Sequence, residues 1–295
     1  MRFLCLHGAG TSGAIFRAQT DAYSLAAFRE KLDPSRHSFE FVDAPHPSPA
    51  GPGVFPFFPP PYFSFWRSTD PKEVAQTHQW LLSYLHGQPQ PYDALLCFSQ
   101  GCSVAASLIL EHQNEQPQVP LPFRAVVFIC GGLPLPILAN WGLPISAAAW
   151  EVHERTASEL WEQAGAVESI LTARQAKLDA SQARPAANSL LADPESENLY
   201  APPAIDPHNV FGLDLTRFPE SCRLNLPTLH IIGSQDPRCP SAIQLALLSA
   251  AGQRLVYDHG GGHEVPRTTR VSEAIAAAVG WLEACLDACL DDCKG

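Results

Sequence analysis

The five residues Cys97-Phe98-Ser99-Gln100-Gly101 (CFSQG) place a serine at a sharp turn between a strand and a helix. The preceding run Tyr92–Phe98 (YDALLCF) is apolar and strand-like, and Ser103–Leu110 (SVAASLIL) is compatible with a helix. A serine in such a turn has a strained backbone, so the residues two before and two after it need to be small. Gly101 meets this demand fully, and Cys97 meets it in part because cysteine carries a Cβ. The pattern predicts a nucleophile elbow, with an ordinary serine N-cap as the alternative.

Short apolar runs alternate with helical runs on both sides of this turn. Strands are expected at Arg2–Leu6, His37–Val42, Tyr92–Phe98, Phe123–Ile129, Thr228–Ile232 and Arg254–Tyr257. Helices are expected at 16–32, at 71–86, from the elbow to Asn114, at 146–164, at 167–180 and at 271–290. This alternation predicts an α/β fold with a doubly wound, mostly parallel sheet whose strands are buried on both faces.

The length of 295 residues suits one α/β domain, residues 1–295, that carries an insertion. The strand pattern stops between residues 133 and 222, so this stretch is expected to be a helical insertion in the position of a lid. Residues 45–66 are rich in Pro, Gly and aromatic side chains, which excludes a helix interior or a central strand. They form either an extended loop packed by its own aromatics or an apolar wall beside a pocket.

Composition excludes several classes of function. The chain has 46% hydrophobic residues, 17% charged residues and a net charge of −11, which disfavours nucleic acid and anionic membranes as partners. No apolar run is long enough to span a membrane or to serve as a secretory signal. The nine cysteines are odd in number and scattered, so we expect reduced thiols and a cytoplasmic protein. Cys285, Cys289 and Cys293 share a helix face but lack further ligands, and we expect neither metal nor cofactor.

A serine nucleophile requires a histidine base, and the histidine requires a carboxylate that holds its tautomer. In open α/β sheets such groups gather after the carboxyl ends of strands. Asp236 follows the strand TLHII, and His263 follows RLVY and three glycines. The order Ser99, Asp236, His263 is the one expected for α/β-hydrolases. His259 is the alternative to His263 as the base, and Asp258 is the alternative to Asp236 as the acid. Asp258, however, would crowd the loop that carries the base.

Acyl transfer also requires hydrogen-bond donors for an oxyanion. One donor is expected from the backbone N–H of Gln100, the residue after the nucleophile. The turn His7-Gly8-Ala9-Gly10 follows the first strand and suits the second donor. Ala9 is our first choice for this N–H, and Gly10 is the second. The alternative is that this segment is a tight turn without a chemical role.

Six segments resemble the FSH serine hydrolase family of α/β-hydrolase-fold esterases and thioesterases, many of them from fungal biosynthetic clusters. The segments are LCLHGAG at 4–10, VDAP at 42–45, FSQG at 98–101, FICGG at 128–132, GSQDP at 233–237 and GGHEVP at 261–266. The resemblance implies Ser99 as nucleophile, Asp236 as acid and His263 as base. The chain differs from the usual pattern at Cys97, where the family has glycine, and in the long segment 133–222.

The resemblance implies cleavage of an acyl ester or thioester, with release or editing of a polyketide or other acyl chain. An acyl-carrier domain of a polyketide synthase is the partner that it suggests. Large apolar residues are expected to line the substrate pocket: Phe55, Phe57, Phe58, Trp66, Trp141 and Trp150. Two alternatives remain, namely an inactive binding protein that keeps the fold and a variant that transfers or cyclises the acyl group.

Overall fold

The computed structural model describes residues 1–21, 28–55, 57–179, 199–200 and 205–292. Within these ranges seven strands form one sheet in the order β2-β1-β5-β6-β8-β9-β7. All neighbouring pairs are parallel except β7 with β9. The strands are β1 Arg2–Leu6, β2 Ser38–Val42, β5 Ala94–Phe98, β6 Ala125–Ile129, β7 Leu199–Tyr200, β8 Thr228–Ile232 and β9 Arg254–Asp258. The doubly wound, mostly parallel sheet is therefore confirmed.

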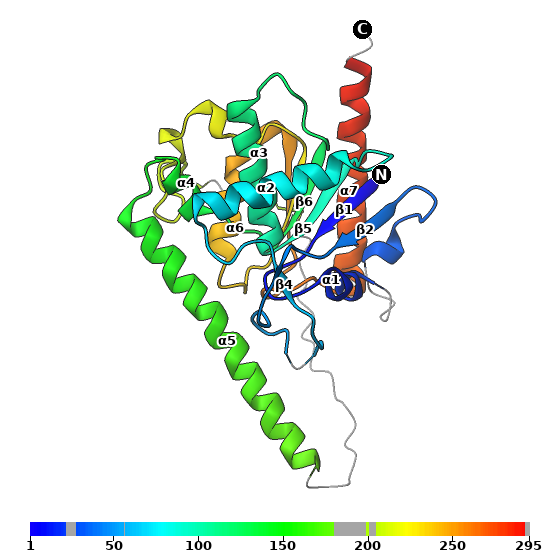
Figure 1. Ribbon diagram of the computed structural model, residues 1–295, viewed down its shortest axis with the longest axis vertical. Helices are drawn as coiled ribbons and strands as arrows, with labels where there is room; N and C mark the ends of the chain where they lie inside the picture. The colour runs from blue at the N-terminus through cyan, green and yellow to red at the C-terminus, as the bar shows by residue number, and fades with distance from the viewer. Residues whose placement is uncertain (22–27, 56, 180–198, 201–204, 293–295) are drawn as a thin grey trace.

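Helices cover both faces of the sheet, and alternate strand residues pack against them (Figure 1). Helices α2 Pro71–His86 and α3 Gln100–Glu115 pack with Leu95 and Cys97 on one face. Helices α1 Gly13–Thr20 and α7 Thr269–Asp292 pack with Ala94 and Leu96 on the other. Because both faces are covered, the strands are apolar throughout rather than alternating.

The predicted helix over 16–32 differs from the observed structure. Helix α1 begins at Gly13, because the Ser12 side chain caps it by accepting a hydrogen bond from the Ile15 N–H at 3.2 Å. It ends at Thr20, and a 3-10 turn, η1, covers Phe28–Lys31. Residues 22–27 lie outside the described ranges.

The segment between β6 and β8 holds α4 Leu135–Asn140, α5 Ala147–Asp179, β7 and two 3-10 turns, η2 Leu215–Arg217 and η3 Glu220–Cys222. The prediction of two helices over 146–164 and 167–180 was wrong, since α5 is continuous through 179, and residue 180 is not described. Its interior contains one glycine, Gly165, and no proline, and a single glycine costs a helix only about 1 kcal/mol. Figure 1 shows α5 extending away from the sheet as one long rod.

Helix α4 and three further features are absent from the sequence-based expectations. Helix α6 Cys239–Leu248 follows β8, and the short antiparallel strand β7 lies at the sheet edge. Two-residue strands β3 His46–Pro47 and β4 Phe63–Ser64 pair as an antiparallel bridge inside the Pro-rich stretch. Such short elements carry little periodicity, so pattern alone does not reveal them. None of the described helices is long and apolar enough to cross a membrane.

His230 is a buried titratable group in β8. Its side chain is 1% exposed, stacks on Phe128 and lies 3.0 Å from the Ser249 hydroxyl through Nε2. Burial, with a smaller contribution from the Arg254 charge, lowers the pKa of His230 to about 3. The folded protein therefore keeps this imidazole neutral, whereas the unfolded chain protonates it below its ordinary pKa of about 6.5.

We predict that acidification weakens the fold through His230. Between pH 6.5 and about 3 the unfolded state binds the extra proton, so the free energy of unfolding falls as the pH falls. The contribution of one such group to this change in the free energy of unfolding approaches about 1.4 kcal/mol per pH unit. Urea unfolding at pH 7, 6 and 5 measures it. His230→Gln should show a shallower loss between these pH values than the unsubstituted protein, and an unchanged slope would contradict the assignment.

Candidate active site

Ser99 stands at the junction of β5 and α3 in a backbone conformation that is rare for a non-glycine residue. Its φ is +51° and its ψ is −113°. Strain of this kind costs about 1–3 kcal/mol and persists only where surrounding structure enforces it. The Ser99 N–H donates to the Ile129 carbonyl at 3.1 Å, and its carbonyl accepts from the Cys102 N–H at 3.0 Å. These bonds hold the serine at the carboxyl edge of the sheet.

The two neighbouring small residues have different roles. A Cβ on Gly101 would lie 2.4 Å from the Leu6 carbonyl oxygen, so only glycine lets α3 start this close to β1. The Cys97 side chain is fully buried and packs in the core that lies between the sheet, α2 and α3. The Cβ at position 97 is therefore accommodated beside the strained serine.

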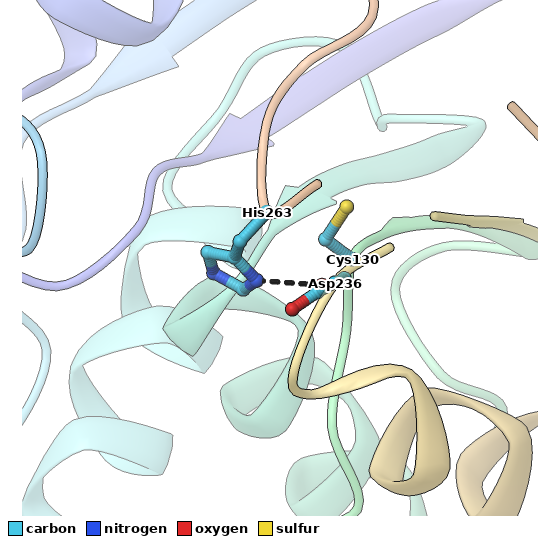
Figure 2. Close-up of side chains that lie close together, drawn as sticks. All are labelled: Cys130, Asp236 and His263. Atoms are coloured by element: carbon cyan, nitrogen blue, oxygen red, sulfur yellow. Dashed lines mark hydrogen bonds and ion pairs between the residues drawn. The ribbon is translucent and has the colours of Figure 1, made fainter. Parts of the chain in front are cut away.

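His263 hydrogen bonds to both predicted partners. Its Nε2 lies 2.9 Å from Ser99 Oγ, and its Nδ1 lies 2.8 Å from Asp236 Oδ2, a contact that Figure 2 marks. The Asp236 side chain is 1% exposed, and its Oδ1 accepts from the Arg238 backbone N–H at 2.7 Å. With Nδ1–H donating to the carboxylate, Nε2 is free to accept the serine proton. The loops after β5, β8 and β9 thus bring Ser99, Asp236 and His263 together.

The competing pair Asp258 and His259 shapes the loop instead. Asp258 Oδ1 accepts from the backbone N–H groups of Ser234 and Gly260, at 3.0 and 2.8 Å. His259 Nδ1 accepts from the Gly261 N–H, and burial lowers the pKa of its imidazole. In the described residues neither side chain hydrogen bonds to Ser99. Their contacts fix the turn that carries His263.

Cys130 is a site residue that sequence reasoning missed. It follows β6 with a φ of +47°, and its thiol lies between Asp236 and the His263 loop (Figure 2). Its Sγ is 3.4 Å from the Glu264 carbonyl oxygen, so the S–H ties that loop to the sheet. Ligand atoms of Cys130, Asp236 and His263 lie within 4.8 Å of one another. They fit a metal poorly, because burial raises the pKa of the thiol and the His–Asp pair is already satisfied.

The turn after β1 is organised by His7, which is completely buried. Its Nε2 accepts from the Ala44 N–H at 3.0 Å, and its Nδ1 lies 2.7 Å from the Gly8 carbonyl oxygen. The Gly10 N–H donates to the Phe63 carbonyl at 2.9 Å, so it is already engaged. The Ala9 N–H has no acceptor in the described part of the chain. Ala9 and Gln100 both line the cavity at Ser99, as an oxyanion site requires.

The Gln100 side chain also braces the Pro-rich stretch. Its Oε1 accepts from the Phe65 N–H at 2.8 Å, and its Nε2 donates to the Trp66 carbonyl at 3.0 Å. The residue after the serine therefore fixes the segment that follows β4. This contact was not expected from the sequence, because it joins two positions that are 34 or 35 residues apart.

A cavity of about 250 Å³ opens at Ser99. It is lined by Ala9, Ser99, Gln100, Ser103, Cys130, Gly132, Leu160, Arg238 and His263. None of the six aromatics predicted for the substrate pocket is among these lining residues. Phe55 and Phe57 are exposed, and Phe58 is half-buried. Trp66 is in the hydrophobic core, and Trp150 packs against that core. Trp141 lines a second cavity. Their contact with a substrate stays a prediction.

A second chain of serine, histidine and carboxylate lies between α2 and α3. His78 Nδ1 is 2.6 Å from Glu111 Oε2, and His78 Nε2 is 2.8 Å from Ser107 Oγ. Ser107 is completely buried inside a helix and is not among the residues that line the cavity at Ser99. This chain joins two helices and offers an internal control for experiments on Ser99.

We predict that substitutions on the two sides of Ser99 differ in their effect on catalysis. Gly101→Ala forces a Cβ against the Leu6 carbonyl and should cost about 1–3 kcal/mol of stability while sharply reducing hydrolysis of 4-nitrophenyl butyrate. Cys97→Gly removes a buried side chain and should cost a similar free energy of unfolding, but turnover of the folded protein should change by less than about threefold. A large gain in turnover would show that the cysteine distorts the elbow.

The model of the family described as serine hydrolase (FSH1) matches residues 1–275. An esterase of Fusarium mangiferae, FPY3, is 26% identical over 269 residues, which cover 90% of this chain and 89% of that protein. The esterase alnB of Emericella nidulans is 27% identical, with 95% of each chain covered.

A thioesterase of Aspergillus terreus, named for dihydromonacolin L and the lovastatin nonaketide synthase, is 33% identical over 137 residues, or 40% of this chain and 50% of that one. The family match extends well beyond this shared segment and includes every loop that contributes to the site. The chain therefore belongs to the serine hydrolase (FSH1) family and is a hydrolase with the α/β-hydrolase fold.

Proposed function

We propose that this hydrolase cleaves acyl esters or thioesters by two-step acyl transfer through Ser99, His263 and Asp236. The continuous hydrogen-bond chain from Ser99 Oγ through the imidazole to the Asp236 carboxylate is the observation that carries the proposal. A strained backbone presents the serine to a cavity, and the family membership supports the reaction class.

In the first step His263 Nε2 takes the Ser99 hydroxyl proton as Oγ bonds to the acyl carbon. The carbonyl π electrons move to the oxygen, and the N–H groups of Ala9 and Gln100 stabilise the resulting oxyanion. The buried Asp236 carboxylate holds the imidazole orientation and stabilises its protonated form. When the tetrahedral intermediate collapses, His263 gives the proton to the departing thiolate or alkoxide.

In the second step water attacks the acyl group on Ser99, and His263 accepts a proton from that water. Collapse of the second intermediate breaks the bond to Ser99 Oγ and releases a carboxylic acid. His263 returns the proton to the serine, so the enzyme is regenerated. Replacement of water by a hydroxyl of the substrate would instead yield a lactone.

The relatives suggest a setting in secondary metabolism. The thioesterase of Aspergillus terreus is named for a polyketide synthase, which favours a polyketide or similar acyl chain as the substrate. An acyl-carrier domain is the partner that could present such a chain as a thioester. We infer a cytoplasmic location, which the free thiols of Cys5, Cys97, Cys102, Cys130, Cys222 and Cys239 support.

A fluorophosphonate probe tests the identity of the nucleophile. We expect one adduct per chain, on the peptide that contains Ser99, because the Ser99 hydroxyl is hydrogen bonded to a histidine and also faces a cavity. Ser99→Ala should lose the adduct. Ser107→Ala is the matched control, since it removes the serine of the buried chain with His78, and it should keep the adduct. Absence of labelling in the folded, unsubstituted protein would support the inactive binding protein instead.

Replacement of the carboxylate tests how His263 is oriented. Asp236→Asn retains the size of the side chain but favours the wrong imidazole tautomer. We predict a fall in kcat of roughly 10²- to 10⁴-fold with a smaller change in KM. Asp258→Asn serves as the comparison, because Asp258 supports only the loop. Equal losses in the two variants would argue against a direct role for Asp236.

A further inference from the structure

Arg238 places a positive charge in the wall of the catalytic cavity. It precedes α6 and lies two residues after Asp236. Among the described side chains that line the cavity it alone is permanently charged; the others are the small, neutral or titratable groups named above. The two-step mechanism leaves this guanidinium without a role.

Within the described part of the chain, the hydrogen-bond partners of the Arg238 guanidinium are neutral groups. Its Nη1 donates to the His153 carbonyl at 2.7 Å and to Thr156 Oγ1 at 2.8 Å, and its Nη2 lies 3.2 Å from His153 Nδ1. Burial and the adjacent Arg238 charge lower the pKa of His153 to about 4, so this imidazole is uncharged at neutral pH. A guanidinium has five N–H donors, and these contacts leave two available.

No described carboxylate forms an ion pair with this guanidinium. The nearest one along the chain, Asp236, directs Oδ2 to His263 and Oδ1 to the Arg238 backbone N–H. Burial lowers the pKa of Arg238, and the Asp236 charge opposes that shift. A guanidinium nevertheless stays protonated in proteins, so the cavity wall holds a cation whose desolvation is only partly compensated. An anionic group in the cavity would complete the compensation.

The space beside Arg238 is kept open by a glycine. A Cβ on Gly132 would lie 2.9 Å from Ser241 Oγ and 3.7 Å from Arg238 Nη2. The Ser241 hydroxyl is 3% exposed and has no hydrogen-bond partner in the described part of the chain. An unpartnered buried hydroxyl and a guanidinium with spare donors thus flank a cavity-lining position that carries no side chain.

We propose that Arg238 selects substrates whose acyl chain carries a second, anionic group, and that a carboxylate is this group. The proposal rests on acyl transfer at Ser99 and narrows its substrate class. Ser99 and Arg238 line the same cavity of about 250 Å³, which has room for roughly ten non-hydrogen atoms, because a protein cavity of about 150 Å³ holds one benzene molecule. A carboxylate therefore reaches Arg238 from a carbonyl at Ser99 when a few carbons separate the two groups, as in the half-ester or half-thioester of a short dicarboxylic acid. A planar guanidinium fork binds such a group through paired hydrogen bonds.

Arg238 also connects α6 to α5, because three hydrogen bonds of its guanidinium reach His153 and Thr156. A purely structural connection and a binding role have different kinetic consequences. Loss of the connection would affect charged and uncharged substrates alike. Loss of an anion-binding group would selectively reduce turnover of the charged one, so the ratio of their kcat/KM values separates the two roles.

The test uses the N-acetylcysteamine thioesters of glutaric acid and of its uncharged isostere, 4-carbamoylbutanoic acid. For the unsubstituted enzyme we expect kcat/KM to be at least about tenfold higher for the glutaryl thioester. Arg238→Gln should reduce this ratio to about one, and Arg238→Lys should restore part of it. Arg223→Gln is the matched control, because Arg223 also donates to backbone carbonyls but does not line the cavity. Its ratio should equal that of the unsubstituted enzyme.

A binding measurement separates this proposal from the proposed mechanism. Calorimetric titration of folded Ser99→Ala with glutarate should show binding that Arg238→Gln, added to the same variant, abolishes. If glutarate binds in this way but the unsubstituted enzyme turns over neither thioester, the proposed mechanism is wrong and the anion-binding site at Arg238 still stands. Equal turnover of the two thioesters, or a ratio unchanged by Arg238→Gln, would overturn the anion site alone. A third comparison uses the neutral acyl chain as its coenzyme A thioester and as its N-acetylcysteamine thioester. If the enzyme prefers the coenzyme A thioester and Arg238→Gln removes that preference, Arg238 binds phosphates of the leaving group. This result would overturn the proposal that Arg238 binds a carboxylate of the acyl chain.

Discussion

The close approach of α3 to β1 at Gly101 is the constraint on which the site depends. A Cβ on Gly101 would lie 2.4 Å from the Leu6 carbonyl oxygen, and the chain enters α3 directly before this glycine through the strained conformation of Ser99. That conformation places Oγ beyond the strand end, within reach of the loops that follow β8 and β9. Backbone strain at one residue thus determines where three distant segments meet, and the parallel sheet supplies the rigidity that maintains it.

The electrostatics of the site follow from the same geometry. Asp236 is almost completely buried, yet both carboxylate oxygens accept hydrogen bonds, one from His263 and one from the Arg238 backbone. Cys130 remains a protonated thiol that tethers the histidine loop, because burial opposes its ionisation. Arg238 is the exception, since its charge lacks a paired carboxylate in the described structure. Asp236 and Arg238 both follow β8 in the same loop. A substrate anion bound to Arg238 would therefore place substrate recognition and catalysis on that one loop.

The sequence was sufficient to predict the parallel sheet, the elbow and the mutual approach of Ser99, Asp236 and His263. These features follow from local apolar runs and from the rule that parallel strands end at one edge. The contacts of Cys130 and Arg238 depend instead on how loops pack after folding. Cys130 lies in the family segment FICGG, but the local pattern does not reveal the role of either residue. The aromatic pocket illustrates the same limit, because apolarity alone does not distinguish the core position of Trp66 from a cavity wall. The unbroken α5 shows that a single glycine is a weak helix boundary.

The central claim is that Ser99 carries the acyl group between the two steps. Rapid quenching of the enzyme in acid during turnover of a thioester, followed by peptide mass spectrometry, measures this directly. We expect a peptide containing Ser99 whose mass is raised by the acyl group, at a level that rises and falls with turnover. Turnover without any acylated Ser99 peptide, or with the acyl group on Ser107 or a cysteine, would contradict it.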